Sequence, residues 1–294
     1  MARAARSRRH GRGAASTRGD LPRDRAVRVW TLGSGSKGNS ILVECDGTRV
    51  LIDAGYSPRE LTKRLANVHI APQSICAVIV THEHIDHMRG LASAQRRWKW
   101  PVFGSAGTVN ALDGLDARAV TAIRSPAPFT IGALQFELVR VPHDATAPTA
   151  VLATSVRTGF RTGIAHDLGA VPNSLRAAFA HLDLLLLESN HDEEMLRTGP
   201  YPPFLQARIS GGSGHLSNRQ SAALTRDLAS AQLRQLVLLH LSEENNTPGR
   251  AVSAAQGALR AARVRCAVTP APQDRATGPF GDASGGERQL ALAL

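Results

Sequence analysis

The residues best suited to chemistry lie in one short stretch, His82-Glu83-His84-Ile85-Asp86-His87, with three histidines and one aspartate within six positions. Imidazole suits zinc and other late divalent metals, and carboxylate widens the choice toward manganese and iron. On an extended or tightly turned loop, His82 and His84 can share one ion. Asp86 and His87 can turn toward a second ion nearby. We therefore predict a metal site rather than a chance cluster of histidines or a weak contact to nucleic acid.

The sequence on both sides of this stretch indicates what positions it. Residues 77–80, Ala-Val-Ile-Val, form a short apolar run bounded by turn-like sequence, as in a buried parallel strand. Residues 90–100 have a helical pattern. The histidines therefore lie on a loop that leaves the carboxyl end of a strand, where open α/β sheets place their ligands.

Three further candidates lie far along the chain. A pair of metal ions needs about seven protein ligands, and the loop supplies four of them. His143, Asp167 and His240 each lie at or just past the end of an apolar run, so all three face the same edge of the expected sheet. We expect Asp167 to bridge the two ions, and His143 and His240 to complete one ion each.

Other polar residues are candidates for supporting roles. Asp53 is expected to accept hydrogen bonds from the metal loop or from a ligand imidazole. Asn190, His191 and His215 are candidates for substrate contact or protonation of a leaving group, and His215 is the preferred one. His166 is expected to be structural, and we assign no role to Glu83.

The glycine-rich stretch 33–40, Gly-Ser-Gly-Ser-Lys-Gly-Asn-Ser, resembles a phosphate-binding loop only superficially. It lacks the Gly-Lys-Ser/Thr ending of a P-loop, and a strand follows it where a helix should. Lys37, Asn39 and the loop amides remain candidates for contacts to a substrate phosphate or to the metal ligands.

The chain has 294 residues and a formal net charge of +11. Residues 1–28 contribute +7 of this charge, through nine arginines against two aspartates, so the remainder is only mildly basic. We expect residues 1–26 to be a disordered basic arm, either dispensable or an aid to nucleic-acid binding.

Cysteine usage and hydropathy indicate the compartment. The three cysteines, Cys45, Cys76 and Cys266, lie far apart, which argues against a disulfide framework or a thiolate metal site. No apolar run is long enough to span a bilayer, and none follows the basic start as in a secretory signal. We expect a cytoplasmic protein without a membrane partner; an organellar transit peptide is the alternative.

Apolar and turn patterns predict an alternation of strands and helices over residues 27–270, which indicates one domain of the α/β class in layers. Residues 105–128 are expected to be irregular with one or two helical turns, and the Gly- and Pro-rich residues 199–214 to form a loop. The last strand is expected at 264–269, followed by a disordered tail over 271–294.

Taken together, these stretches resemble the metallo-β-lactamase superfamily, whose hallmark is T-H-x-H-x-D-H after an L-I-D-A-G stretch, here 81–87 and 51–55. One branch, the YycJ-like family (also called WalJ or VicX), is similar over about residues 29–270. The matching stretches are LGSGSKGNS at 32–40, PHDATAP at 142–148, ESNHD at 188–192, GHLSN at 214–218 and HLSEENN at 240–246. His166 departs from this pattern, since a small hydroxyl residue is expected before the bridging aspartate.

The resemblance implies an αββα sandwich with two metal ions, zinc or manganese, at one edge. By motif, His82, His84 and His143 hold one ion, and Asp167 bridges. The other ion then falls to Asp86, His87 and His240. The 73 positions from Asp167 to His240 are too few for the inserted domain of the β-CASP nucleases.

Three functions are compatible with this sequence. The leading hypothesis is a dinuclear-metal hydrolase of phosphodiester bonds in DNA, and the resemblance implies double-stranded DNA. In this hypothesis the ions generate hydroxide, Asp86 orients the nucleophile and His215 contacts phosphate or donates a proton. The second is a thioester or lactone hydrolase of glyoxalase II type, and the third a metal-stabilised, non-enzymatic accessory protein of cell-wall signalling. No pattern in the sequence indicates an oligomeric state.

Overall fold

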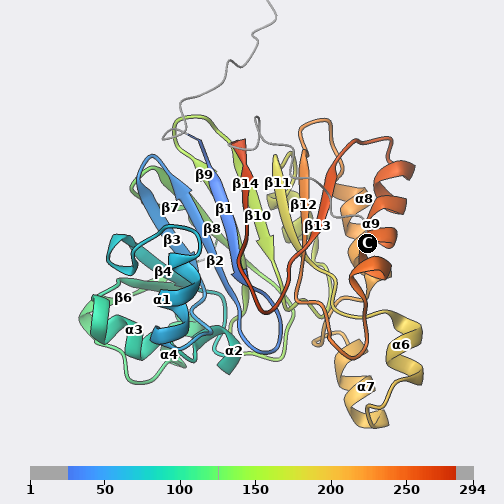
Figure 1. Ribbon diagram of the computed structural model, residues 1–294, viewed down its shortest axis with the longest axis horizontal. Helices are drawn as coiled ribbons and strands as arrows, with labels where there is room; N and C mark the ends of the chain where they lie inside the picture. Colours follow the sequence, from blue (N-terminus) through green and yellow to red (C-terminus); the bar gives the residue numbers. More distant parts are fainter. Residues whose placement is uncertain (1–25, 125, 283–294) are drawn as a thin grey trace, which may run out of the picture.

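The computed structural model describes residues 26–124 and 126–282, and it packs two seven-stranded sheets face to face with helices on both outer faces (Figure 1). The αββα sandwich expected from the sequence is therefore confirmed. The basic arm expected at 1–26 lies almost wholly outside the described residues.

The first sheet has the strand order β14-β1-β2-β3-β4-β5-β6. Its strands β3, β4, β5 and β6 run parallel, while β14, β1 and β2 join as antiparallel neighbours. The bounds are β1 Arg28–Gly33, β2 Ser40–Cys45, β3 Thr48–Ile52, β4 Ala77–Val80, β5 Val102–Ser105, β6 Val120–Ile123 and β14 Thr277–Gly281.

The second sheet has the order β13-β12-β11-β10-β9-β8-β7. Here β10, β11, β12 and β13 run parallel, while β7, β8 and β9 are antiparallel. The bounds are β7 Phe129–Ile131, β8 Leu134–Arg140, β9 Thr149–Ser155, β10 Arg161–Ala165, β11 Leu184–Glu188, β12 Gln235–Leu239 and β13 Ala267–Pro270.

Helices α1 and α3 cover the outer face of the first sheet, and α5, α8 and α9 cover that of the second. The bounds are α1 Pro58–Ala66, α2 Ile85–Met88, α3 Leu91–Trp98, α4 Ala106–Asn110, α5 Asn173–Ala178, α6 Glu193–Thr198, α7 Pro203–Ser210, α8 Asn218–Leu228 and α9 Pro248–Ala261. Single 3-10 turns lie at Pro72–Ser74 and Ala117–Ala119. Among the described helices, none has the length and apolar character needed to cross a membrane.

Burial on both faces explains why the central strands are continuously apolar. In β11, Leu184 and Leu186 point into the core between the two sheets, whereas Leu185 and Leu187 pack under the helices of the second sheet. In β4 the same alternation divides Ala77 and Ile79 from Val78 and Val80. Such runs are typical of parallel strands that are covered on both sides.

The parallel strands bring their carboxyl ends to one edge of the sandwich. β3 and β4 end there in the first sheet, and β10, β11 and β12 end there in the second. The residue that follows each strand therefore faces a common edge, which is where the polar candidates lie.

Two segments expected to be irregular contain regular structure. Residues 105–128 contain α4, which is the helical turn expected there, and also strand β6, which was not expected; the expected loop at 199–214 contains α7. α7 begins with Pro203, which suits the first helical turn. None of its eight residues is buried, so the sequence carries no apolar periodicity that would have revealed it.

The tail expected to be disordered from residue 271 is also a correction. Residues 277–281 form β14, which pairs with β1 at the end of the first sheet. Phe280 enters the core between the sheets, and Gly281 exchanges hydrogen bonds with the side chain of Gln235. The folded domain thus extends to residue 282, and residues 283–294 lie outside the described part.

Candidate metal centre

The loop after β4 has the form that its spacing predicts. His82 and His84 lie on extended backbone, and the short helix α2 then turns the chain so that Asp86 and His87 face back toward them. The carbonyl of His84 accepts hydrogen bonds from the amides of His87 and Met88, which fixes this turn. Four ligand-type side chains therefore converge within one stretch of chain.

His82, His84 and His143 form the first group, with ligand nitrogens within 4.8 Å of one another. His143 Nδ1 faces the carbonyl of Gly214 at 3.0 Å, so the ring donates there and turns Nε2 toward His84 Nδ1, 3.3 Å away. His82 Nε2 is buried without a hydrogen-bond partner. Burial lowers the pKa of His82 well below its usual value and also lowers that of His143. Neutral imidazoles with open nitrogens are suited to bind a metal.

Asp86, His87 and His240 form the second group, again within 4.8 Å. Asp86 Oδ2 lies 3.3 Å from His87 Nε2 and 3.6 Å from His240 Nε2. His240 Nε2 is otherwise a buried atom without a hydrogen-bond partner. This group has the mixed imidazole and carboxylate donors that zinc and manganese accept.

Asp167 lies between the two groups. Its Oδ2 atom is 3.0 Å from His87 Nε2, and its Oδ1 atom is 3.3 Å from His240 Nδ1. With His82 and His87 it forms a further close cluster. Asp167 therefore contacts two imidazoles of the second group and lies within 4.8 Å of His82 of the first group.

Carboxylates outside the two groups orient the imidazoles. Asp53 is fully buried; it accepts hydrogen bonds from the amide and hydroxyl of Thr81 and faces His87 Nδ1 at 2.7 Å. Asn39 Nδ2 lies 3.1 Å from Asp86 Oδ2. A Cβ atom at Gly55 would lie 1.8 Å from the carbonyl oxygen of Asp86, so only glycine allows this approach.

Three of these side chains follow strand ends in the left-handed backbone region. The φ angles are 64° at Asp53, 56° at Asp167 and 53° at His240. For residues other than glycine such conformations cost about 1–3 kcal/mol each, and they gather at functional sites. The surrounding sheets hold the backbone there, which turns each side chain across the end of its strand.

Glu188 is a site residue that the sequence reasoning did not single out. It is fully buried at the end of β11 and accepts hydrogen bonds from the amides of Leu168 and Leu216. Its Oε1 atom faces His215 Nδ1 at 2.7 Å. Although burial opposes ionisation, His215 lowers the pKa of Glu188 to about 2. A charged residue at the end of the most apolar strand was the available signal.

His215 lines the opening of the centre. Burial disfavours its charged form, but Glu188 outweighs this effect and raises the pKa of the His215 imidazole above its usual value. Because Nδ1 is engaged by Glu188, Nε2 remains for a ligand in the pocket. The pocket has a volume of about 350 Å³, and its lining includes Asp86, Asp167 and His215.

Helix α7 and the segment around Asp144 form another wall of the pocket, which the sequence did not reveal. Tyr201, Leu205 and Arg208 line it from this side. Arg208 donates to Asp144 Oδ2 from Nε at 2.9 Å and Nη2 at 2.6 Å. Asp144 Oδ1 in turn lies 3.3 Å from His143 Nε2, so α7 is connected to the first metal group.

Three residues that were candidates for contact with the substrate lie outside the pocket lining. Asn190 and His191 are 6% and 1% exposed and are absent from the pocket lining, which favours a supporting role over a substrate contact. Asn190 instead donates to the carbonyl of His240 at 2.9 Å. Lys37 pairs with Glu243 on the surface, whereas its neighbour Ser36 lines the pocket.

His166 lies buried behind the ligands, as a structural residue would. Its Nδ1 atom is 2.9 Å from Asp167 Oδ2 and its Nε2 atom 3.3 Å from Asp53 Oδ2. Glu83, to which we assigned no role, accepts a hydrogen bond from the amide of Thr146.

The charge balance of the centre calls for cations. Burial alone would lower the pKa of His87, but Asp167 and Asp53 raise this pKa well above its usual value. Burial would also lower the pKa of His240, but Asp167 raises it to about 10. Buried carboxylates thus stabilise positive charge at the positions where metal ions would bind. The open nitrogens of His82 and His240 and this charge balance together fit a pair of divalent ions.

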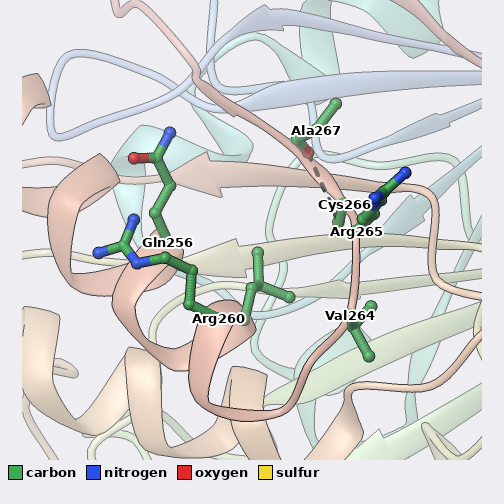
Figure 2. A pocket seen from close by; sticks show the side chains of 7 residues that line it. Gln256, Arg260, Val264, Arg265, Cys266 and Ala267 are labelled. Atoms are coloured by element: carbon green, nitrogen blue, oxygen red, sulfur yellow. Dashed lines mark hydrogen bonds between the residues drawn. The ribbon is translucent and has the colours of Figure 1, made fainter.

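A second cavity, of about 420 Å³, lies between α9 and β13 (Figure 2). Its lining includes Arg260, Arg265 and Cys266 but no histidine or carboxylate. Burial raises the pKa of Cys266 to about 12, and its Sγ atom donates to the carbonyl of Ala267. A single cysteine that this pKa keeps as the neutral thiol does not make a metal site.

Comparison with known proteins supplies independent information. Residues 48–241 match the family described as Beta-lactamase superfamily domain. The chain is 32% identical over 222 residues to the exodeoxyribonuclease WalJ of Streptococcus pneumoniae, covering 73% of this chain and 81% of that protein. It is 30% identical over 221 residues to the exodeoxyribonuclease YycJ of Bacillus anthracis, covering 73% and 82%.

Among solved structures, the metallo-β-lactamase fold protein YhfI from Bacillus subtilis is similar, with a TM-score of 0.66 and 16% sequence identity. The match covers 86% of this chain and 99% of that one. At this identity the likeness concerns the fold alone, and it agrees with the two-sheet sandwich described above.

Proposed function

The chain belongs to the metallo-β-lactamase superfamily, in its YycJ-like branch, and from this membership we propose that it is an exonuclease that hydrolyses phosphodiester bonds of DNA. As a member of this family it is a metal-dependent hydrolase. The finer proposal is double-stranded DNA as the substrate and two ions, zinc or manganese, as the cofactor.

The observation that carries the proposal is the convergence of six ligand-type side chains around Asp167. His82, His84 and His143 would hold one ion, and Asp167 would bridge. Asp86, His87 and His240 would hold the other. When bound, such a pair of ions activates water near neutral pH and stabilises the charge on a phosphate undergoing displacement.

The protein's own groups orient the reaction. Asn39 fixes the carboxylate of Asp86 at the pocket, where Asp86 would direct the attacking oxygen. Glu188 engages His215 Nδ1, so the protonated imidazole would offer its Nε2 proton to the departing oxygen. Arg208 lines the pocket, and Lys37 follows the pocket residue Ser36 and accepts a hydrogen bond from Arg89 at its carbonyl; these cations would attract the phosphates that flank the bond. Three free cysteines agree with the reducing cytoplasm as its place of action.

Cleavage of end-labelled linear double-stranded DNA tests this proposal. Metal-stripped protein would be resupplied with manganese or with zinc, and Asp86→Asn would be run in parallel. We expect cleavage by the wild-type protein alone, with products that shorten from an end. Hydrolysis of a thioester or lactone panel by protein that leaves DNA intact would contradict the proposal.

A further inference from the structure

Helices α6 and α7 form a lobe at one end of the molecule, residues 193–210, which extends beyond the two sheets (Figure 1). No residue of α7 is buried, although Phe204, Leu205 and Ile209 are apolar. An isolated helix of eight residues is marginal in water, since most helices are stabilised by packing an apolar face. α7 therefore presents apolar surface that a ligand can cover.

This apolar surface is continuous with the metal pocket. Tyr201, Leu205 and Ile209 line the pocket from the lobe. The amide of His215 donates to the carbonyl of Ile209 at 2.8 Å, and Arg208 is bonded to Asp144. The lobe is thus attached to the rim of the centre at two points, and a ligand held on α7 would reach the metal ligands.

Phe204 lies beside this rim. It is 75% exposed and lies four residues before Arg208, so the two side chains share one side of α7. Ile85, on the metal loop between two pocket residues, is 60% exposed. Among the described residues, the remaining large apolar side chain of comparable exposure is Val156, 62% exposed, at the far end of β9.

We propose that Phe204 stacks on an unpaired base beside the scissile phosphodiester, so that the enzyme engages a frayed or single-stranded end of DNA. This inference rests on the proposed nuclease function. An exposed aromatic ring next to cations is a common platform for nucleobases, because each base offers a π face whatever its sequence. Arg208, whose side chain is 67% exposed, lies where it would contact the adjoining phosphate.

The first test compares Phe204→Ala and Phe204→Trp with the wild-type protein on DNA with a frayed end. Loss of one stacked base raises KM by about tenfold, a value toward the lower end of the range for such contacts. Phe204→Trp should restore most of this loss. With ethyl p-nitrophenyl phosphate, which carries no base, the loss caused by Phe204→Ala should be about tenfold smaller than the loss on DNA.

Val156→Ala is the matched control, since it removes an exposed apolar side chain just past the end of β9, about 20 Å along that strand from the site. It should leave KM for DNA unchanged. An unchanged KM for Phe204→Ala, or an equal loss on DNA and on the small diester, would overturn the stacking role. A shift of Phe204→Ala from dimer to monomer in sedimentation, with KM unchanged, would assign the lobe to a second copy instead.

A double-mutant cycle makes the test specific for the base. An abasic nucleotide at the frayed end should raise KM about tenfold for the wild-type protein and cause no further increase for Phe204→Ala. Independent, additive increases would contradict stacking. Failure of the wild-type protein to cleave any DNA, while it hydrolyses the small diester, would overturn the nuclease function and with it this inference. Normal cleavage with an unaffected Phe204→Ala would overturn the inference alone.

Discussion

The two halves of the sandwich have similar architecture but supply the metal centre in different ways. In the first sheet, one loop after β4 carries four ligand candidates within six residues. In the second sheet, the ligand candidates are single residues near the ends of three strands: His143 after β8, Asp167 after β10 and His240 after β12. The loop is therefore visible in the sequence as a motif, whereas the other ligands acquire meaning only when the parallel strands bring their ends together.

If both halves of the sandwich are needed for the metal centre, loss of a ligand from either half should reduce turnover to a similar extent. We expect His87→Ala and His240→Ala each to reduce turnover by about a thousandfold or more, because metal ions supply several kcal/mol of transition-state stabilisation. Each variant should bind one metal ion in place of two, as measured by elemental analysis after gel filtration. Full metal content and turnover in His240→Ala would show that the loop half is sufficient.

The halves also differ in how their edges are completed, because β14 adds a strand from the end of the chain to the first sheet. Phe280 on β14 is 7% exposed and packs in the core between the sheets. Phe280→Ala should lower the free energy of unfolding by about 3 kcal/mol, from lost burial and the cavity left behind. Urea denaturation measures this change, and a loss below about 1 kcal/mol would mean that β14 contributes little.

A smaller effect is expected from the carboxylates that orient the ligands. Asp53 supports His87 in the first half, and Glu188 faces His215 and His240 in the second. Asp53→Asn and Glu188→Gln keep the size of the side chain but remove its charge. We expect each to reduce metal affinity or turnover by about 10- to 100-fold. Metal titration with a competing chelator would measure the affinity. Wild-type affinity and turnover in either variant would show that its carboxylate does not support the metal ligands.

The weakest link joins the two halves at the surface. Lys37 and Glu243 pair at 2.8 Å, with side chains 70% and 52% exposed. Because exposed ion pairs are screened by water and salt, Lys37→Ala should change the free energy of unfolding by less than about 0.5 kcal/mol. A loss above about 1 kcal/mol in urea denaturation would show that this bridge holds the halves together.

The same comparison explains how much the sequence could predict. Continuous apolar runs revealed the central strands, and the residues after them placed Asp167 and His240 at the correct edge. Glu188 was missed because a single glutamate after an apolar run has no spacing pattern to reveal it. For His191 the sequence left a supporting role and a substrate contact as alternatives, since polarity near a strand end does not distinguish a side chain that faces the pocket from one packed behind it.

The regular elements that were missed depend on tertiary contacts rather than on local pattern. α7 has no buried face, so it shows no helical periodicity, and β14 is a short strand that contains glycine and proline. β14 forms because it pairs with the edge of β1 and because Phe280 is buried in the core between the sheets. Neither partner is adjacent in sequence, which is why a disordered tail was expected there.

The central claim is that the loop and the strand ends together form one dinuclear centre that cleaves DNA. Its most direct test measures the cleavage rate of end-labelled DNA while manganese or zinc is added in known equivalents to metal-stripped protein. We predict that the rate rises with bound metal and reaches its maximum at two ions per chain. A maximum at one ion, or intact DNA with two ions bound, would contradict the claim.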